Sequence, residues 1–335
     1  MAGEERSGER PAYFLEAENI PEAFEKAMKK VWFDGVPIKT QYDKPGDPES
    51  KDAAVLIRVK NPFAQPRFHR TFADGIGGIA EYVQEVVNGA HDYWISSPEN
   101  IIEEVKTGKK KDTKWTYTYH QRLFEAPNPI GEPENQIETM INNLAKDTYS
   151  RRANAVTWIQ YIDGHLSDPP CLQRLWGRIF EDENGKKYLN FDSEWRSRDL
   201  KKAWFENAIA ITTLQKRVAE AISEKRNEEI LVGPYTDFSN SLHIYGSYFR
   251  EMEGDPEKGV KTFFESLSSR PFSSDNALNA TSRTYTSEQV RELFINDGCG
   301  KGLENMLKRE KDMPEKARAL VEKDLQRLKD GSYIP

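Results

Sequence analysis

The residues best suited to chemistry lie between Ser150 and Cys171, in the run S-R-R-A-N-A-V-T-W-I-Q-Y-I-D-G-H-L-S-D-P-P-C. Two adjacent arginines open the run, a strand-like apolar stretch follows, and Cys171 stands directly after a Pro-Pro pair. An arginine pair is ordinarily solvated, and a lone cysteine is ordinarily a small buried hydrophobe. Together these residues predict a rigid turn that presents one thiol, with two guanidinium groups suited to a phosphate.

The composition indicates a globular protein with a sizeable core. The chain has 335 residues, of which 37% are hydrophobic and 31% charged, enough for one large domain or two small ones. No run approaches the roughly 18 apolar residues that a membrane helix needs. The N-terminus, M-A-G-E-E-R-S-G-E-R-P, has no apolar signal-peptide region. We therefore expect a cytoplasmic protein with no membrane partner.

The cysteines and the net charge exclude other classes. Cys171 and Cys299 lie far apart and show no metal-ligand spacing, so neither a metal site nor a disulfide framework is expected. A net charge of −7 argues against a nucleic-acid binder, and the basic run from Lys109 to Lys114 is smaller than an RNA-binding patch needs. This run is expected to be solvated, with contact to a polyglutamate tail as the alternative. Binding of a small anion needs only local arginines.

Periodicity places the elements of the N-terminal half. A helix is predicted over 20–31 with Pro21 at its first position, and a strand over 53–60. A helix over 78–87 would bury Ile79, Tyr82, Val83 and Val86. The alternation in 115–124 predicts a strand, and 137–146 predicts a short amphipathic helix.

The C-terminal half continues with strands and one long helix. Strands are predicted over 172–180 and 188–197, joined by a hairpin turn at Asn184-Gly185. Asp199 can cap a helix that runs to about residue 225. A strand over 239–248 would place His243 and Tyr245 on one face. We expect a disordered N-terminus over 1–12, a catalytic domain over 13–250 and a charged helical extension over 251–335.

Five short motifs occur in order: Arg151-Arg152, Pro170-Cys171, R-S-R-D at 196–199, Asn207, and H-I-Y at 243–245. The combination resembles the thymidylate synthase and pyrimidine nucleotide hydroxymethylase family over roughly 57–249. It is similar to the short archaeal-type members, which read P-C-L-Q and S-N-S-x-H-I-Y. The resemblance implies one α/β (α+β) domain built on a large twisted mixed sheet flanked by helices, followed by the helical extension.

The resemblance also implies a reaction. A thiolate of Cys171 would add to C6 of a uracil ring and make C5 nucleophilic toward the one-carbon unit of 5,10-methylenetetrahydrofolate. Arginines near the thiol would lower its pKa. Glu81 would move protons through water, and Tyr119 would assist removal of the C5 proton. Glu85, one turn further along the same helix, is the competing candidate for the catalytic glutamate.

Further residues would bind the substrates. Arg151 and Arg152 would reach the nucleotide phosphate across a homodimer interface, and Asp199 would bond the pterin. The segment that carries a further phosphate-binding arginine in the family offers only Lys39 and Lys44 here. The same-subunit contacts to the nucleotide would come from Arg196 and Ser197 (phosphate), Asn207 (the O4/N3 edge of the base), and His243 and Tyr245 (the ribose 3′-hydroxyl). An amide suits uracil better than cytosine, so dUMP is the expected substrate.

Four departures from the family pattern bear on the product. Asp168 and Glu206 replace apolar residues, and no tryptophan stands at the family's spacing, since Trp94 and Trp115 are displaced. The chain end, G-S-Y-I-P, lacks an apolar closing tail. All four would admit water, which favours 5-hydroxymethyl-dUMP over thymidylate.

Alternatives stay open at this point. Within the family these are a thymidylate synthase that makes dTMP and dihydrofolate, and a (d)CMP hydroxymethylase. A regulatory or structural paralogue is the third, but it would have no need to retain Cys171, Arg196 and Asn207 together.

Overall fold

The computed structural model describes residues 8–70, 75–252, 278, 282–333 and 335. Its strands are β1 (Ala12–Ala17), β2 (Val36–Ile38), β3 (Ser50–Val59), β4 (Phe68–His69), β5 (Asn154–Val156), β6 (Leu172–Glu181), β7 (Lys187–Trp195), β8 (Arg198–Asp199), β9 (Ile230–Ile244) and β10 (Thr284–Tyr285). Its helices are α1 (Ile20–Asp34), α2 (Gly75–Asn88), α3 (Pro98–Thr107), α4 (Tyr119–Phe124), α5 (Gln136–Lys146), α6 (Trp204–Arg226), α8 (Ser287–Ile295), α9 (Leu303–Arg309) and α10 (Glu315–Asp330), with 3-10 turns η1 (Asp92–Trp94), η2 (Asp163–His165) and η3 (Gly246–Met252).

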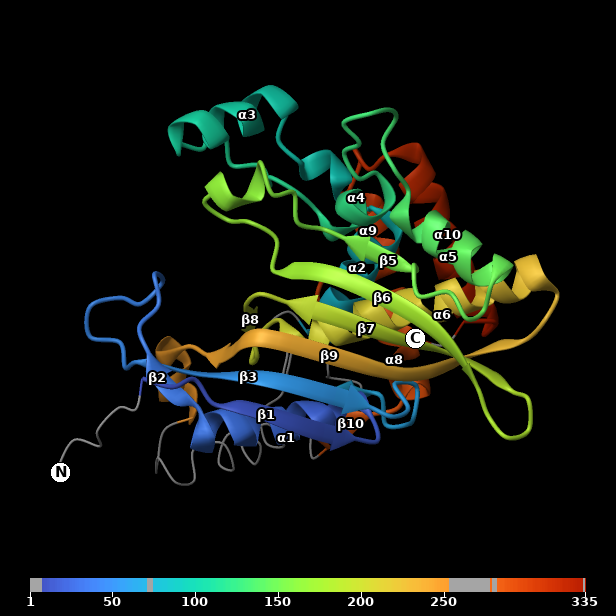
Figure 1. Cartoon of the computed structure of the whole chain (residues 1–335), viewed down its shortest axis with the longest axis horizontal. Helices are drawn as coiled ribbons and strands as arrows, with labels where there is room; N and C mark the ends of the chain where they lie inside the picture. Colours follow the sequence, from blue (N-terminus) through green and yellow to red (C-terminus); the bar gives the residue numbers. More distant parts are fainter. Residues whose placement is uncertain (1–7, 71–74, 253–277, 279–281, 334) are drawn as a thin grey trace.

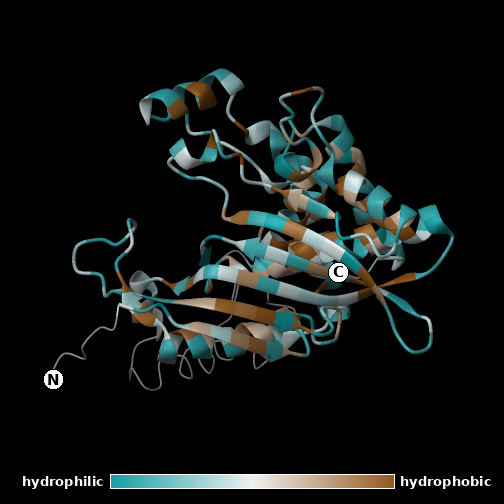
Figure 2. Cartoon of the chain, in the orientation of Figure 1, coloured by the Kyte–Doolittle hydropathy of each residue, from teal (hydrophilic) through white to brown (hydrophobic). Residues whose placement is uncertain are grey.

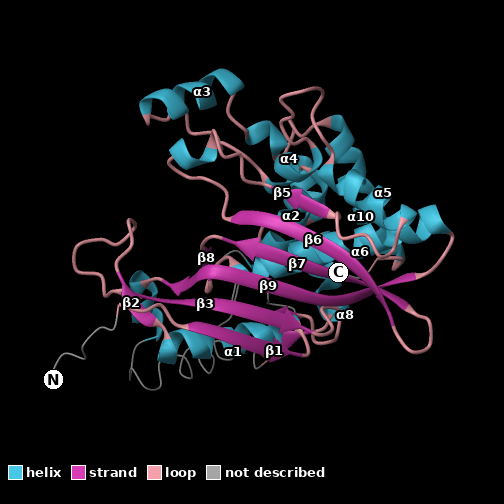
Figure 3. Cartoon of the chain, in the orientation of Figure 1, coloured by secondary structure: helices cyan, strands magenta, loops and turns pink. Residues whose placement is uncertain are grey.

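One large mixed sheet organises the molecule (Figures 1 and 3). Its strand order is β1-β3-β9-β7-β6-β5, with β2 added beside β3 and β8 beside β9. The pairs β1–β3, β7–β9 and β8–β9 are parallel, whereas β2–β3, β3–β9, β5–β6 and β6–β7 are antiparallel. The predicted mixed α/β architecture with a helix-flanked sheet is confirmed.

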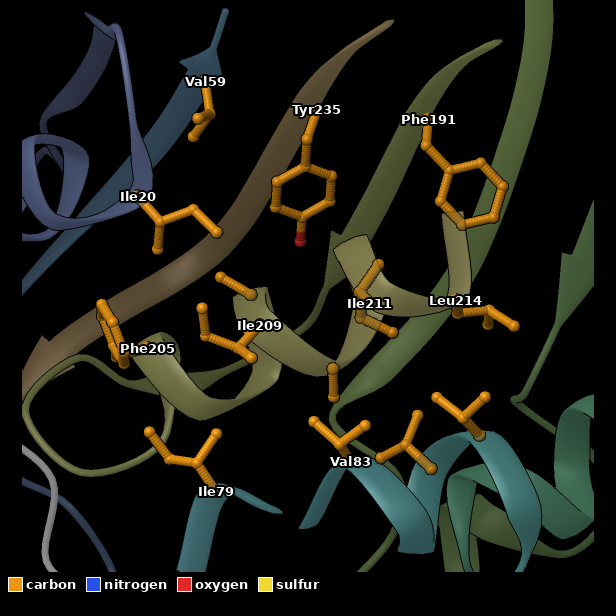
Figure 4. Close-up of a cluster of buried hydrophobic side chains, with 14 of the residues drawn as sticks. Ile20, Val59, Ile79, Val83, Phe191, Phe205, Ile209, Ile211, Leu214 and Tyr235 are labelled. Carbon is orange, nitrogen blue, oxygen red and sulfur yellow. The ribbon is translucent and has the colours of Figure 1, made fainter. Parts of the chain in front are cut away.

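The core lies between this sheet and α2, with α6 in the middle (Figure 4). Tyr235 of β9 and Phe191 of β7 approach α6 from the sheet, while Ile79 and Val83 of α2 approach it from the opposite side. These side chains and Ile211 of α6 are each no more than 1% exposed. Burial of one such side chain stabilises the fold by about 1.5–3 kcal/mol. The long helix is therefore a rigid support for the residues at its N-terminal end.

The opposite face of the sheet carries a partly exposed apolar row. The strand register places Phe14 beside Leu56, and Leu56 beside Phe238. Phe14 is 60% exposed and Leu56 37% exposed. Figure 2 shows such apolar positions alternating with polar ones along the strands. In the single chain this face leaves apolar surface open to solvent.

Several predicted elements are confirmed with adjusted ends. Helix α1 starts as predicted, because Asn19 accepts a hydrogen bond from the Glu22 amide and Pro21 stands in the first turn. Helix α5 and the β6–β7 hairpin also match. The disorder predicted for 1–12 falls largely on residues 1–7, which lie outside the described residues, and β1 already begins at Ala12.

Two local predictions are wrong, and a third is right only in part. The segment 115–124 is not a strand: Thr118 caps α4 by accepting from the Gln121 amide, so Tyr119 opens a helix. Asp199 does not cap the long helix, which begins five residues later with Ala203 at its N-cap position. The strand expected over 239–248 is the C-terminal part of β9 and ends at Ile244.

The C-terminal helices pack against α2. Asp324 of α10 is 2% exposed and accepts hydrogen bonds from Gln84 and Asn88 of α2. It also pairs with Arg217 of α6. Strand β10 pairs with β4, close to the N-terminal helix. The described part of the predicted extension is thus joined to the core by buried polar contacts.

Candidate active site

A cavity of about 570 Å³ opens beside Cys171, at the end of the sheet where β6 begins and β8 lies. Its volume is in the range of pockets that bury a small ligand. Predicted site residues that line it are Tyr119, Cys171, Arg196, Ser197, Asp199, Asn207, His243 and Tyr245. They come from segments between residues 119 and 245, so the sheet and α6 bring them together.

Cys171 is half-buried immediately before β6. Burial raises the pKa of its thiol above the ordinary value, and the carboxylate of Asp168 raises it further. The guanidinium groups of Arg196 and Arg198 act in the opposite direction. The arginines therefore lower the pKa of this thiol as expected, but burial raises it by more.

Arg196 holds the turn that carries the thiol. Its Nε donates to the carbonyl of Pro170 at 2.9 Å, and its Nη2 donates to the carbonyl of Pro169 at 2.7 Å. Its backbone amide donates to the carbonyl of Cys171 at 2.9 Å. The Pro-Pro turn is thereby fixed against the end of β7, and a cation lies close to the thiol.

Tyr119 lines the same cavity as Cys171. Its hydroxyl accepts a hydrogen bond from the amide of Leu172 at 3.4 Å, and its ring packs edge-on against Trp195 at 5.7 Å. Burial raises the pKa of Tyr119 well above its usual range. The phenol is therefore neutral at physiological pH and able to exchange a proton with a water or a ligand.

Asn207 lies at the start of α6 and is buried. Its Oδ1 accepts from Nε of Arg198 at 3.1 Å, and its Nδ2 donates to the hydroxyl of Tyr82 at 2.5 Å. Arg198 in turn is buried and paired with Asp237 of β9. The side-chain amide is thus held in one orientation at the cavity wall.

His243 and Tyr245 lie at another part of the wall, with ring centroids 4.5 Å apart. Burial lowers the pKa of His243, so its imidazole is neutral at physiological pH. Ser241 also lines the cavity; its hydroxyl donates to Asp52 of β3 at 2.6 Å. These neutral donors and acceptors suit hydroxyl groups of a sugar better than a phosphate.

Asp199 lies between the cavity and η3. One carboxylate oxygen accepts from the amides of Lys201 and Lys202, and the other accepts from the hydroxyl of Tyr248 at 2.7 Å. The segment after β2 forms part of the cavity wall. Lys39 in this segment lines the cavity, whereas Lys44 is not among the lining residues.

Three predicted residues do not line this cavity. Glu81 is buried, and its carboxylate accepts from Arg309 of α9 at 2.9 Å. Arg151 and Arg152 are exposed near the start of β5. The competing candidate Glu85 contacts His91 at 2.9 Å and does not line the cavity either.

The residues predicted to admit water are placed as follows. Asp168 is exposed and lines the cavity beside Cys171, and Glu206 lines it beside Asn207. Trp94 and Trp115 instead pack edge-on against each other at 4.8 Å, and His91 stacks on Trp94 at 4.1 Å. Two acidic residues therefore line the cavity.

Sequence reasoning missed several cavity residues. Tyr82 was predicted only as a core position, although a buried tyrosine hydroxyl needs a partner, which was a usable signal. Arg198 gave a similar signal, since a guanidinium two residues after Arg196 cannot be buried unpaired. Ser241 and the segment around Tyr42 gave no distinctive signal.

Within the described residues, no cluster of three or more His, Cys, Asp or Glu side chains is arranged to hold a metal ion. In the same part of the chain, none of the helices combines the length and the apolar character needed to cross a membrane.

The fold and the cavity define an α/β protein with a candidate nucleophilic cysteine among cationic and hydrogen-bonding groups. No protein-family profile matches the chain. The chain is similar to a putative thymidylate synthase of Methanocaldococcus jannaschii, with 28% identity over 233 residues, 68% of this chain and 88% of the relative. It is likewise similar to a putative thymidylate synthase of Methanothermobacter thermautotrophicus, with 28% identity over 72% of this chain and 97% of the relative.

A shorter match extends beyond the archaea. A thymidylate synthase of Lactococcus lactis is 30% identical over 119 residues, 35% of this chain and 40% of the relative. These similarities support a thymidylate synthase-like family of the archaeal type and indicate an enzyme that transfers one-carbon groups.

Proposed function

We propose that the enzyme transfers the one-carbon unit of 5,10-methylenetetrahydrofolate to C5 of dUMP and releases mainly 5-hydroxymethyl-dUMP. The observation that carries the proposal is the placement of Cys171 in one cavity with a cation, an oriented amide and a pair of sugar-binding candidates. The three kinds of group match the phosphate, the base and the ribose of a pyrimidine nucleotide.

The first step is addition of the Cys171 thiolate to C6 of the uracil ring. The new bond is S–C6, and the electron pair of the C5–C6 double bond moves into the conjugated carbonyl, so C5 becomes nucleophilic. Arg196 supports this step because its charge favours the thiolate. Ser197 would join Arg196 in holding the phosphate.

The folate supplies the one-carbon unit when it is bound. Asp199 fits the assignment to the pterin because its carboxylate lines the cavity and accepts N–H groups, as an aminopyrimidinone ring would require. Tyr119 would assist transfer of the C5 proton. The role of Glu81 as proton carrier stays a prediction, since its carboxylate contacts Arg309 in this structure.

A homodimer would complete the phosphate site. Arg151 and Arg152 are exposed and lie outside the cavity of their own chain, so they would serve the partner's site. The apolar row of Phe14, Leu56 and Phe238 supports a second copy on the open face of the sheet, because exposed apolar rows of this kind favour association. Figure 1 shows α6 and α2 behind the sheet, away from that face.

The hydroxymethyl product is supported by the two carboxylates at the cavity wall. Asp168 is exposed next to the thiol and would be hydrated, so water would compete with hydride for the exocyclic methylene on C5. Thymidylate formation is the second candidate, and the names of the relatives favour it.

The product ratio tests the proposal. Wild-type enzyme should convert dUMP to 5-hydroxymethyl-dUMP with release of tetrahydrofolate, and Asp168→Leu should raise the methylated fraction. The nucleotides are separated by chromatography, and dihydrofolate is followed by its near-ultraviolet absorbance. Formation of one dihydrofolate per nucleotide by the wild type would establish a thymidylate synthase instead.

A further inference from the structure

Glu81 of α2 carries a carboxylate whose two oxygens have different surroundings. Its side chain is 10% exposed, and Oε1 accepts a hydrogen bond from Nη2 of Arg309 at 2.9 Å. Oε2 has no hydrogen-bond partner among the described residues, and it is not one of the fully buried atoms that lack a partner. One oxygen is therefore anchored, while the other is open to a water molecule.

Arg309 is the last residue of α9 and uses all three nitrogens of its guanidinium group. Besides the bond to Glu81, Nε donates to Oε1 of Glu310 at 2.8 Å, and Nη1 donates to the carbonyl of Gly300 at 2.9 Å. Glu310 is 6% exposed and also accepts from the hydroxyl of Tyr93. The guanidinium group is thus held in one orientation, which fixes the position of the Glu81 carboxylate.

The segment that carries Arg309 lies tightly against α2. Helix α9 packs on α2 (Figure 1). A Cβ on Gly77 of α2 would come within 2.8 Å of atoms of Asp297 and Lys301, so a side chain at this position would push the loop before α9 away. Arg318 of α10 supports the other end of α9, because it donates to two backbone carbonyls there. The anchor of Glu81 is therefore built on a rigid contact between elements.

The ion pair joins the C-terminal extension to the catalytic domain. Arg309 lies outside the segment of roughly 57–249 that resembles the family, whereas Glu81 lies within it. The archaeal relatives are matched over most of their length, while part of this chain is left unmatched. The extension thus contributes a residue next to the helix that forms part of the cavity wall.

We propose that Arg309 is a positioning residue for Glu81, which it anchors at Oε1 so that Oε2 can exchange protons with water near the nucleotide. This inference rests on the proposed function, in which Glu81 is the predicted proton carrier. The next residue along α2, Tyr82, lines the cavity, so the backbone of Glu81 lies beside the cavity wall. Oε2 takes a proton from one water and gives a proton to another, so no further reactant is consumed.

This role has a specific kinetic signature. A proton carrier acts only when it lies within hydrogen-bond reach of its partner. Without Arg309 the carboxylate of Glu81 can rotate, so Oε2 spends less time in the productive position. The candidate groups for the phosphate, the base and the ribose line the cavity and do not contact Arg309. Loss of the anchor should therefore lower kcat and leave the affinity for the nucleotide unchanged.

The test compares Arg309→Gln with Lys308→Gln, which removes an exposed cation one residue earlier in α9. Release of tritium from C5-labelled dUMP, with methylenetetrahydrofolate present, gives kcat and KM. Calorimetric titration gives the dissociation constant of dUMP. We expect Arg309→Gln to lower kcat about tenfold while this dissociation constant stays at the wild-type value. Lys308→Gln should match the wild type in both measurements.

Two further variants separate positioning from a structural role. Arg309→Lys keeps the charge but loses the forked donors, so it should restore part of the lost kcat. In the Glu81→Gln background, Arg309→Gln should lower the residual kcat no further, because the arginine acts only through that carboxylate. Melting temperatures report that each variant is folded.

The outcomes that overturn the proposal are distinct. An unchanged or raised kcat in Arg309→Gln, in an enzyme that turns over dUMP, would overturn the positioning role alone. A loss that adds in full to the loss in Glu81→Gln would do the same. Wild-type enzyme that does not convert dUMP would overturn the proposed function, and this inference with it.

Discussion

Cys171 lies between opposing electrostatic influences. Burial and the carboxylate of Asp168 raise the pKa of the thiol, whereas Arg196 and Arg198 lower it. The reactive species is the thiolate, so each neighbouring charge changes the fraction of enzyme that is ready to react at a given pH. Asp168 would thus affect both the nucleophile and the water near the product.

The thiol titration of Asp168→Asn tests this balance. Removing the carboxylate removes one cause of the raised pKa, so the thiolate should form at lower pH and the rate of alkylation at neutral pH should rise. The rate of reaction with iodoacetamide is followed against pH in a Cys299→Ser background, because Cys299 is exposed and would also react. Glu183→Gln in the exposed β6–β7 turn is the control and should show the unchanged profile. A profile of Asp168→Asn displaced to higher pH would contradict the account.

Helices and strands were predicted best where the sequence shows only one periodic pattern of apolar residues. Helix α5 and the β6–β7 hairpin have a single clear pattern, and the structure confirms both. The segment around Tyr119 alternates like a strand, but the side chain of Thr118 caps a helix there, and local capping prevailed over alternation. The Cys171 turn was predicted from its residue types, and Arg196 and Asn207 from the resemblance; the structure places all three at one cavity. Tyr82 and Arg198 were missed as cavity residues because contacts between α2, β8 and α6 decide where the tyrosine hydroxyl and the guanidinium find their partners.

The packing of α10 on the core can be tested at Asp324. Its carboxylate receives hydrogen bonds from two amides of α2 and an ion pair from Arg217, all in a buried setting. Asp324→Ala would leave Arg217 and the amides without this partner and should lower the free energy of unfolding by about 3–5 kcal/mol. Glu322→Ala, on the exposed side of the same helix, should change it little. Urea denaturation measures the free energy of unfolding of both variants. Equal values would show that α10 is not anchored by this network.

At the scale of the whole molecule, the proposed phosphate site is incomplete within one chain. Arg196 lies at the cavity, but Arg151 and Arg152 lie outside it, and the open sheet face exposes an apolar row. These observations support a symmetric dimer in which each chain completes the site of the other.

Mixing of two inactive variants tests the shared site. Arg152→Ala and Cys171→Ser should each be inactive alone, but a mixed dimer holds one site with an intact arginine pair and an intact thiol. Random exchange should therefore restore about a quarter of wild-type activity. A mixture of Arg152→Ala with Arg196→Ala is the control, because it tests subunit exchange between two variants that both keep the thiol. Verified mixed dimers of the first pair that stay inactive would place the arginine pair in its own chain's site.

The central claim is one-carbon transfer to C5 of dUMP through Cys171, and mass spectrometry of the nucleotide tests it most directly. Enzyme is incubated with dUMP and methylenetetrahydrofolate labelled with carbon-13 and deuterium in the transferred unit. We expect the label to appear on C5, mainly as a hydroxymethyl group, and Cys171→Ser to form no such product although it binds dUMP. Full turnover by Cys171→Ser, or unlabelled dUMP recovered from a folded wild-type enzyme, would contradict it.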